Sequence, residues 1–153
     1  MNPVFIKIIS GVVATFAFAL IFRLKPSHWL FATLDGLLAC VAYFVFAGLF
    51  ETDFLPYVLS SFICAYGAEV FARVCKAPAT VFLLPGCIAL VPGGSLYYSM
   101  SNLLSSDYVA AAKFLLVTVE VGVAIGAGFI IASIVRFVTF KLYDSIVLYF
   151  RKK

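Results

Sequence analysis

Long apolar stretches separated by short polar stretches run through the sequence, and this pattern predicts membrane-spanning helices. Uniform stretches of this kind cover residues 3–22, 29–50, 54–74 and 109–135. Each has close to or more than the ~20 residues that a helix needs to cross a bilayer. A further stretch, residues 78–104, is also apolar but is interrupted. The sequence therefore predicts one all-α transmembrane domain over residues 1–153, with about five spans of which the fourth is broken.

The composition supports an integral membrane protein. Of the 153 residues, 65% are hydrophobic and 12% are charged, and the mean hydropathy is +1.14. Soluble globular domains carry a charge on about a quarter of their residues. A cleaved signal peptide is an alternative interpretation of residues 3–22, because Ala17-Phe18-Ala19 resembles a cleavage site. Only Lys7 supplies positive charge before the apolar run, which favours a retained helix.

Several functional classes find no support in the sequence. The four cysteines lie in or beside apolar stretches, without a CxxC pair or a histidine cluster, so we expect packing residues, no metal site and no cofactor. The sequence lacks an activated serine or cysteine motif and a nucleotide-binding loop, which argues against an enzyme. The basic residues gather at the borders of the apolar stretches, which argues against a nucleic-acid-binding protein.

The interrupted stretch contains two proline–glycine motifs, Pro85-Gly86 and Pro92-Gly93-Gly94. Proline has no amide N–H and its ring crowds the carbonyl four residues earlier, so each motif should break the helix. Broken backbone at membrane depth must be buried in protein or line a water-filled cavity. Transporters use such breaks to hold small anionic or zwitterionic solutes. The alternative is a helix that is only kinked and packed among its neighbours.

Polar residues follow the second motif. If the helix restarts after Gly94 with Ser95 as its N-cap, its first amide groups point into the cavity with a partial positive charge. Tyr97 and Tyr98 could hydrogen-bond a hydroxylated solute, or alternatively anchor the helix at the outer interface. The predicted substrate-binding residues are Pro85, Gly86, Pro92, Gly93, Gly94, Ser95, Tyr97 and Tyr98.

The same stretch resembles a known family. PATVFLLPG at residues 78–86 and LVPGGSLYYSM at residues 90–100 are similar to the signature of the small subunit of split threonine/serine exporters, which resembles the C-terminal half of the single-chain exporters. The resemblance is densest over residues 73–102. It implies a larger membrane-embedded partner subunit and a small hydroxy amino acid as substrate, with dicarboxylates such as succinate also within the family. The family pattern often has a further proline at the position of Ala89.

The charges predict the orientation. Most basic residues lie on one side of the membrane, and Glu51, Asp53 and Asp107 lie on the other. The positive-inside rule then predicts an inner-membrane protein with its N-terminus outside and its C-terminus in the cytoplasm. The tail, residues 136–153, is predicted to be an amphipathic helix that binds anionic lipid at the inner interface, or else an extension of the fifth span. Nine of the 11 basic residues share the inner face: Arg23, Lys25, Arg73, Lys76, Arg136, Lys141, Arg151, Lys152 and Lys153.

Three further features concern single helices. Glu120 is far from both interfaces, so we predict a proton-coupling residue; the alternatives are a glutamate hydrogen-bonded to a neighbouring helix or paired with a basic residue of the partner subunit. Glu69 and Arg73 have the spacing of a helical ion pair. Gly122 and Gly126 form a GxxxG face that is predicted to pack against another helix.

Together these features predict one subunit of a secondary exporter of small polar metabolites, of the threonine/serine or dicarboxylate type. The absence of a nucleotide-binding loop indicates an ion gradient or another chain as the energy source, and we expect the proton gradient to drive export. The alternative function is a non-transporting membrane scaffold or assembly subunit whose glycine face binds another helix.

Overall fold

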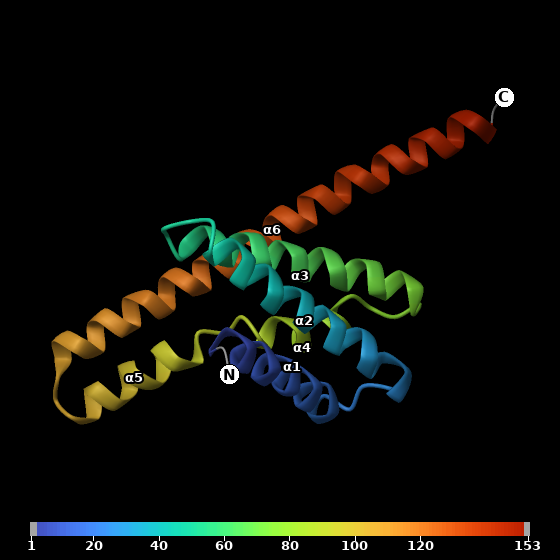
Figure 1. The fold of residues 1–153 in the computed structure, drawn as a ribbon. Helices are drawn as coiled ribbons and strands as arrows, with labels where there is room; N and C mark the ends of the chain where they lie inside the picture. The colour runs from blue at the N-terminus through green and yellow to red at the C-terminus, as the bar shows by residue number, and fades with distance from the viewer. Residues whose placement is uncertain (1–2, 152–153) are drawn as a thin grey trace.

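The computed structural model describes the backbone of residues 3–151 and the side chains of residues 4–139. Four of the described helices are long and apolar enough to cross a membrane, and a bent pair can form a fifth span. The predicted all-α membrane fold is therefore confirmed. The helices are α1 (Pro3–Ile21), α2 (Pro26–Ala47), α3 (Phe54–Val74), α4 (Thr80–Ile88), α5 (Gly93–Leu104) and α6 (Tyr108–Arg151) (Figure 1).

The start of α2 lies earlier than predicted. Lys25 is extended, with ψ of 140°, and Pro26 occupies the first turn of the helix. Proline suits this position because its φ is fixed near the helical value and its missing N–H would have no partner there. Asp35 consequently lies about 14 Å along α2 at the helical rise per residue. This position is close to the middle of the 22-residue helix.

The bent pair α4–α5 differs from the prediction in one respect. Pro85 lies inside α4 and does not end it, so the prediction that Pro85-Gly86 breaks the helix is wrong. Proline removes one backbone hydrogen bond, but a helix can continue through it when neighbouring helices pack around the kink. Pro85 and Gly86 are both buried. The break falls between Ile88 and Gly93, and the two helices are bent by 55° with respect to each other.

The N-terminus of α5 also differs from the prediction. α5 begins at Gly93, with Pro92 in the N-cap position and no side-chain hydrogen bond to the cap. Ser95 is therefore the third residue of the helix and not its N-cap. Proline cannot accept a hydrogen bond through its side chain, so the first amide groups of α5 are left to other partners.

α6 is one continuous helix of 44 residues. The prediction of a separate interfacial helix over residues 136–153 is corrected, because the backbone of the tail continues the fifth span as far as Arg151. The alternative interpretation, an extension of that span, describes the backbone. The predicted contact of Arg151, Lys152 and Lys153 with lipid concerns side chains outside the described residues.

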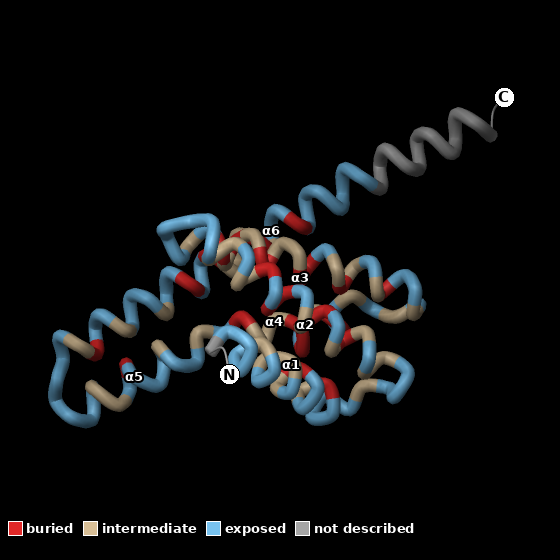
Figure 2. The backbone as a smooth tube through the Cα atoms, viewed as in Figure 1, coloured by how far each residue is buried: buried red, intermediate tan, exposed pale blue. Residues whose placement is uncertain are grey.

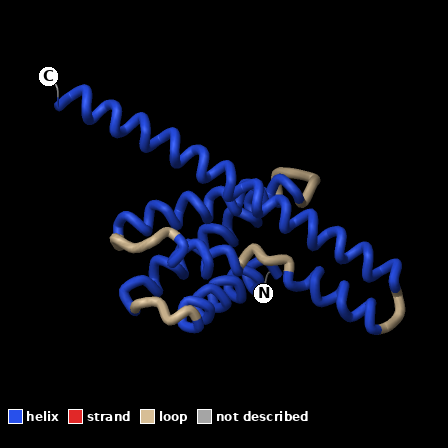
Figure 3. The backbone as a smooth tube through the Cα atoms, turned by 180° about the vertical axis from the view of Figure 1, so that it is seen from behind, coloured by secondary structure: helices blue, strands red, loops and turns tan. Residues whose placement is uncertain are grey.

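The helices form a body and a projecting hairpin. Helices α1 to α4 make the body together with the middle of α6, and α5 pairs with the first half of α6 in a hairpin that extends away from it (Figures 1 and 3). Among the described helices, α5 contacts α6 alone, whereas α2 contacts α1, α3 and α4. Buried positions gather where α2, α3 and α4 meet, and the hairpin is mostly exposed (Figure 2).

Small residues allow the helices of the body to cross closely. Gly36 on α2 faces the side chain of Thr15 on α1, and Gly128 on α6 faces Ser61 and the carbonyl of Val58 on α3. Neither glycine leaves space for a methyl group. Membrane proteins commonly have small residues at such crossings. Within lipid the hydrophobic effect does not hold helices together, so close van der Waals contact must stabilise their association.

Gly128→Ala should push α3 and α6 apart, because the added methyl group would collide with Ser61 and Val58. We expect the chain to lose about 1–3 kcal/mol of stability, seen as a lower melting temperature of the purified protein in detergent. Gly122→Ala is the matched control, since a Cβ atom there meets nothing within 4 Å. That variant should keep or gain stability, by about 0.5–1 kcal/mol. Equal losses in the two variants would contradict the described crossing.

Candidate functional site

The break between α4 and α5 presents backbone donors to open space. The last amide groups before it, those of Leu90 and Val91, donate to carbonyls three residues earlier. After it, the amide groups of Gly94 and Ser95 have no backbone acceptor in the described part of the chain. These groups belong to the first turn of α5 and carry the positive end of its dipole. A Cβ atom added at Gly94 would meet nothing within 4 Å, so this end of α5 is open.

The residues predicted to bind substrate fall into two groups. Residues 92–95 lie at the break, and Tyr97 and Tyr98 follow on α5 with 67% and 53% of their surface exposed. The ring of Tyr98 packs against Phe114 of α6, with 5.4 Å between the ring centroids. The first proline–glycine motif, residues 85–86, is instead buried between α4 and its neighbours. The structure thus separates this motif from the open end of α5.

Asp35 is completely buried, although the sequence analysis did not select it as a site residue. Its Oδ2 accepts a hydrogen bond from the thiol of Cys64 at 3.4 Å, and its Oδ1 has no hydrogen-bond partner among the described residues. A thiol is a weak donor. The carboxyl group has therefore lost its contact with water and has gained little in exchange, which is costly for any polar group and most costly for a charged one.

Two glycines enclose this carboxyl group. A Cβ atom at Gly67 of α3 would lie 2.5 Å from Oδ1 of Asp35, and one at Gly86 of α4 would collide with Oδ2. Gly86 belongs to the first proline–glycine motif. The motif does not break the helix; its glycine makes room for the Asp35 carboxyl group between α2 and α4.

The surroundings of Asp35 contain no counter-charge among the described side chains, residues 4–139. The titratable groups that face it are thiols: Cys64 on α3 and Cys87 on α4, with Cys40 of α2 next to Cys64. From α1, the only charged residue is Lys7, which is exposed near the start of the helix. The described residues also contain no group of three or more His, Cys, Asp and Glu side chains that could hold a metal ion.

Glu120 occupies a different environment. Its side chain is exposed on α6, and its predicted proton-coupling role stays a prediction. Among the described side chains, the fully buried acid is Asp35. A signal for it was present in the sequence, because Ala32, Gly36 and Ala39 surround Asp35 at helical spacing and all three are buried. A face of small residues around one acid indicates a close helix crossing.

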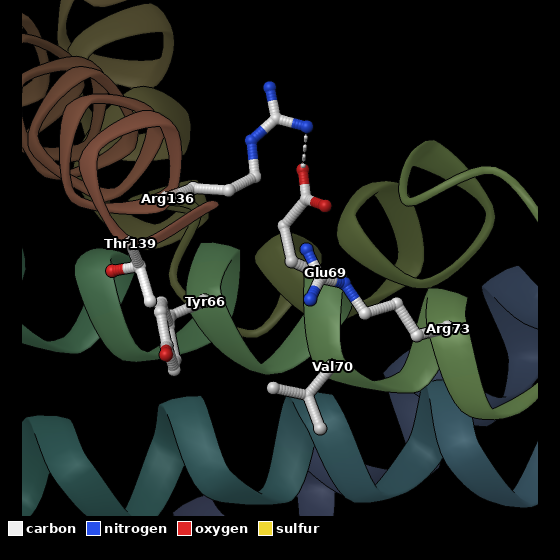
Figure 4. Close-up of a pocket in the computed structure, with 6 residues that line it drawn as sticks. All are labelled: Tyr66, Glu69, Val70, Arg73, Arg136 and Thr139. Carbon is white, nitrogen blue, oxygen red and sulfur yellow. Dashed lines mark ion pairs between the residues drawn. The ribbon is translucent and has the colours of Figure 1, made fainter. Parts of the chain in front are cut away.

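Glu69 connects α3 with α6. Its Oε1 lies 3.0 Å from Nη1 of Arg136, and both side chains are partly exposed (Figure 4). An ion pair in this setting contributes on the order of 1 kcal/mol or less. Arg73, the predicted partner of Glu69, lines a small pocket together with Glu69 and Arg136. The predicted pair Glu69–Arg73 stays a prediction. We regard this group as part of the α3–α6 crossing.

Long apolar helices and one discontinuous helix pair indicate a multi-pass helical membrane protein. The family described as threonine/serine exporter, ThrE, matches residues 7–135, and the chain belongs to this family. The predicted resemblance to threonine/serine exporters is thereby confirmed. This is a transporter family and not an enzyme family, so membership supports a role in export. Comparison with curated proteins and with solved structures gives no match.

Proposed function

We propose that this chain is one subunit of a secondary exporter that moves small polar solutes out of the cytoplasm by exchange with protons. The substrates are hydroxy amino acids such as threonine and serine, or small dicarboxylates such as succinate. The observation that carries the proposal is the break between α4 and α5 in a chain of the exporter family. Such a break within lipid requires either protein packing or water around it.

Open space around the break supports the second possibility. Among the described residues, nothing lies within 4 Å of a Cβ atom built at Gly93 or Gly94, and the amide groups of Gly94 and Ser95 lack backbone acceptors there. A solute carboxylate is the natural partner for donors at the positive end of a helix dipole. Amino acids and dicarboxylates share this carboxylate. The amide groups of Gly94 and Ser95 would thus bind the carboxylate that the two substrate classes have in common.

The exposed hairpin supports a larger partner subunit. Cβ atoms at Gly122 and Gly126 would meet nothing within 4 Å, so the predicted GxxxG face packs against no other helix in the described part of the chain. Glu120 is exposed on the same helix, and a carboxylate that faced lipid at this depth would cost several kcal/mol. A partner that covers the hairpin would close the cavity at the break and supply either a cation or water for Glu120.

The loops support an N-out, C-in orientation in the inner membrane. Arg23 and Lys25 follow α1, Lys76 follows α3, and all three line one pocket, so the two basic loops lie at the same end of the bundle. The positive-inside rule assigns this end to the cytoplasm. If the bent pair is one span, the chain has five spans, and a homologous partner unit that begins inside would be inverted relative to it. Inverted units underlie alternating access in many secondary transporters.

Asp35 is the proposed proton carrier. It lies near the middle of α2, where an ionised carboxylate needs a cation or water, and the groups that face it from α3 and α4 are Cys64, Cys87 and glycines. A protonated carboxyl group fits the closed contact between α2, α3 and α4. Release of the proton would favour separation of these helices, so that water reaches the charge. Because α4 leads directly into the break, this separation would change the cavity.

Cells loaded with labelled threonine or succinate test the proposed function. Cells that contain this chain and its larger partner subunit should export the solute faster than cells that lack either one. In Gly93→Ala/Gly94→Ala, each methyl group enters open space, so the chain should fold and assemble normally. Export should fall about tenfold, which corresponds to ~1.4 kcal/mol, because the methyl groups occupy the cavity and stiffen the break.

Gly48→Ala in the loop after α2 is the control for this double substitution, since a Cβ atom there makes only ordinary contacts, the closest at 3.5 Å. It should export like the wild type. A scaffold subunit predicts the opposite pattern for the double variant, namely normal assembly with unchanged export. Equal export from cells with and without the chain would overturn the proposed function altogether.

Asp35→Asn tests the proton carrier. Asparagine has the size of aspartic acid but cannot release a proton, so the complex should still exchange labelled for unlabelled threonine at equal pH on both sides. In liposomes with an acidic interior, wild-type complex should accumulate threonine, at most about tenfold for each pH unit and coupled proton. The variant should lose this accumulation.

Asp53→Asn is the matched control, because Asp53 is exposed in a loop and its side chain caps no helix. It should accumulate threonine like the wild type. Retained accumulation in Asp35→Asn would exclude Asp35 as the proton carrier and return the role to Glu120 or to the partner subunit. The export function itself is tested separately, by threonine accumulation in liposomes with the wild-type complex.

A further inference from the structure

The loops at the basic end of the bundle repeat one backbone motif. After α1, Arg23 N–H donates to the carbonyl of Leu20 and Leu24 N–H donates to that of Ala19, at 2.9 and 3.1 Å. After α3, Lys76 and Ala77 make the equivalent bonds at 3.3 and 2.9 Å. These pairs of bonds are the Schellman motif, which ends many helices and needs one residue in the left-handed region.

Both left-handed positions carry a cation. Arg23 has φ of 53° and Lys76 has φ of 50°. Glycine is the usual residue there, because any side chain in this region meets a steric penalty. The same motif after α5 places Ser106 at φ of 61°, so the motif itself does not require a basic residue. Arg23 and Lys76 thus place long cationic side chains at two positions where glycine would have a lower steric cost.

The two strained cations line a single pocket. Lys25 and His28 line it as well, and no acidic residue does. No hydrogen bond or ion pair to a side-chain group of Arg23, Lys25 or Lys76 is found within the described side chains. The ring of His28 stacks on Phe82 of α4, with 5.5 Å between the centroids. The pocket therefore combines three unneutralised cations with a wall formed by the start of the broken span.

We propose that this pocket, formed by Arg23, Lys25, His28 and Lys76, binds the phosphate group of an anionic membrane lipid. Three cations without a protein counter-charge favour an oxyanion with several acceptor oxygens. Basic pockets between membrane helices at the cytoplasmic side bind lipid headgroups of this kind. The bound headgroup would join the α1–α2 loop to the α3–α4 loop and so hold the start of α4 in place. This last consequence rests on the proposed function.

Trp29 provides a direct reporter. It is the only tryptophan of the chain, it follows His28, and its indole N–H donates to the carbonyl of Leu24 at 2.9 Å. We expect its emission to change when phosphatidylglycerol is titrated into the purified chain in neutral detergent. Phosphatidylcholine should give a much weaker change. A third titration, with inorganic phosphate, distinguishes a site for the lipid from a site for the free phosphate ion.

Arg23→Gly/Lys76→Gly is the decisive variant. It removes two cations at positions that glycine tolerates, so its melting temperature should stay close to that of the wild type or rise. Its affinity for phosphatidylglycerol should fall roughly 25-fold, at about a factor of five for each basic residue near an anionic headgroup. Ser106→Gly makes the same backbone change at the other end of the molecule and should keep the full affinity.

Arg23→Lys/Lys76→Arg keeps both charges and should retain the preference for phosphatidylglycerol even if the glycine variant folds poorly. Loss of that preference in the charge-preserving variant would overturn the proposal, and so would unchanged binding in the glycine variant. Binding of inorganic phosphate as tight as that of phosphatidylglycerol would overturn the assignment to lipid. None of these outcomes depends on export, so they are distinguishable from a failure of the proposed function.

Discussion

The hydrogen-bonding requirement of the backbone within lipid governs this structure. An uninterrupted helix satisfies its own amide and carbonyl groups, and α1, α2, α3 and α6 do so over lengths that can cross a bilayer. The pair α4–α5 does not, because Pro92 has no N–H and the chain bends by 55° before α5 begins. The exposed amide groups at Gly94 and Ser95 must find partners. In an exporter family, water and a carboxylate solute are suitable partners for these groups.

The two proline–glycine motifs act in different ways on the same segment. The second interrupts the helix, whereas the first lets Asp35 fit against α4, because only a glycine at position 86 leaves space for its carboxyl group. The last turn of α4 therefore contacts the enclosed acid and leads directly into the break. This arrangement is the physical basis for the proposed coupling between protonation of Asp35 and the geometry of the break. The loop that precedes α4 carries Lys76, so a lipid headgroup there would act on the same segment.

The hydrophobic pattern predicted most of the fold. It located α1, α3 and the start of α6 almost to the residue, because these helices are uniform and long. The prediction that Pro85 breaks the helix was wrong, since the sequence does not show which prolines are held inside a helix by the packing of neighbouring helices. It also missed Asp35. Placing the start of the span at residue 29 made that acid look close to the membrane border, and the small residues around it were not recognised as a helix crossing.

Accessibility of the break to water is the most direct test of the account. Val91 lies within the break and is 50% exposed, so Val91→Cys can be introduced into a variant whose native cysteines are replaced and which still exchanges threonine. In the assembled complex, a water-soluble maleimide should label this cysteine, and threonine should slow the labelling. Val123→Cys, on an exposed apolar face of α6, should react slowly in comparison. If Val91→Cys is as unreactive as Val123→Cys and indifferent to solute, the break is packed dry and the account is contradicted.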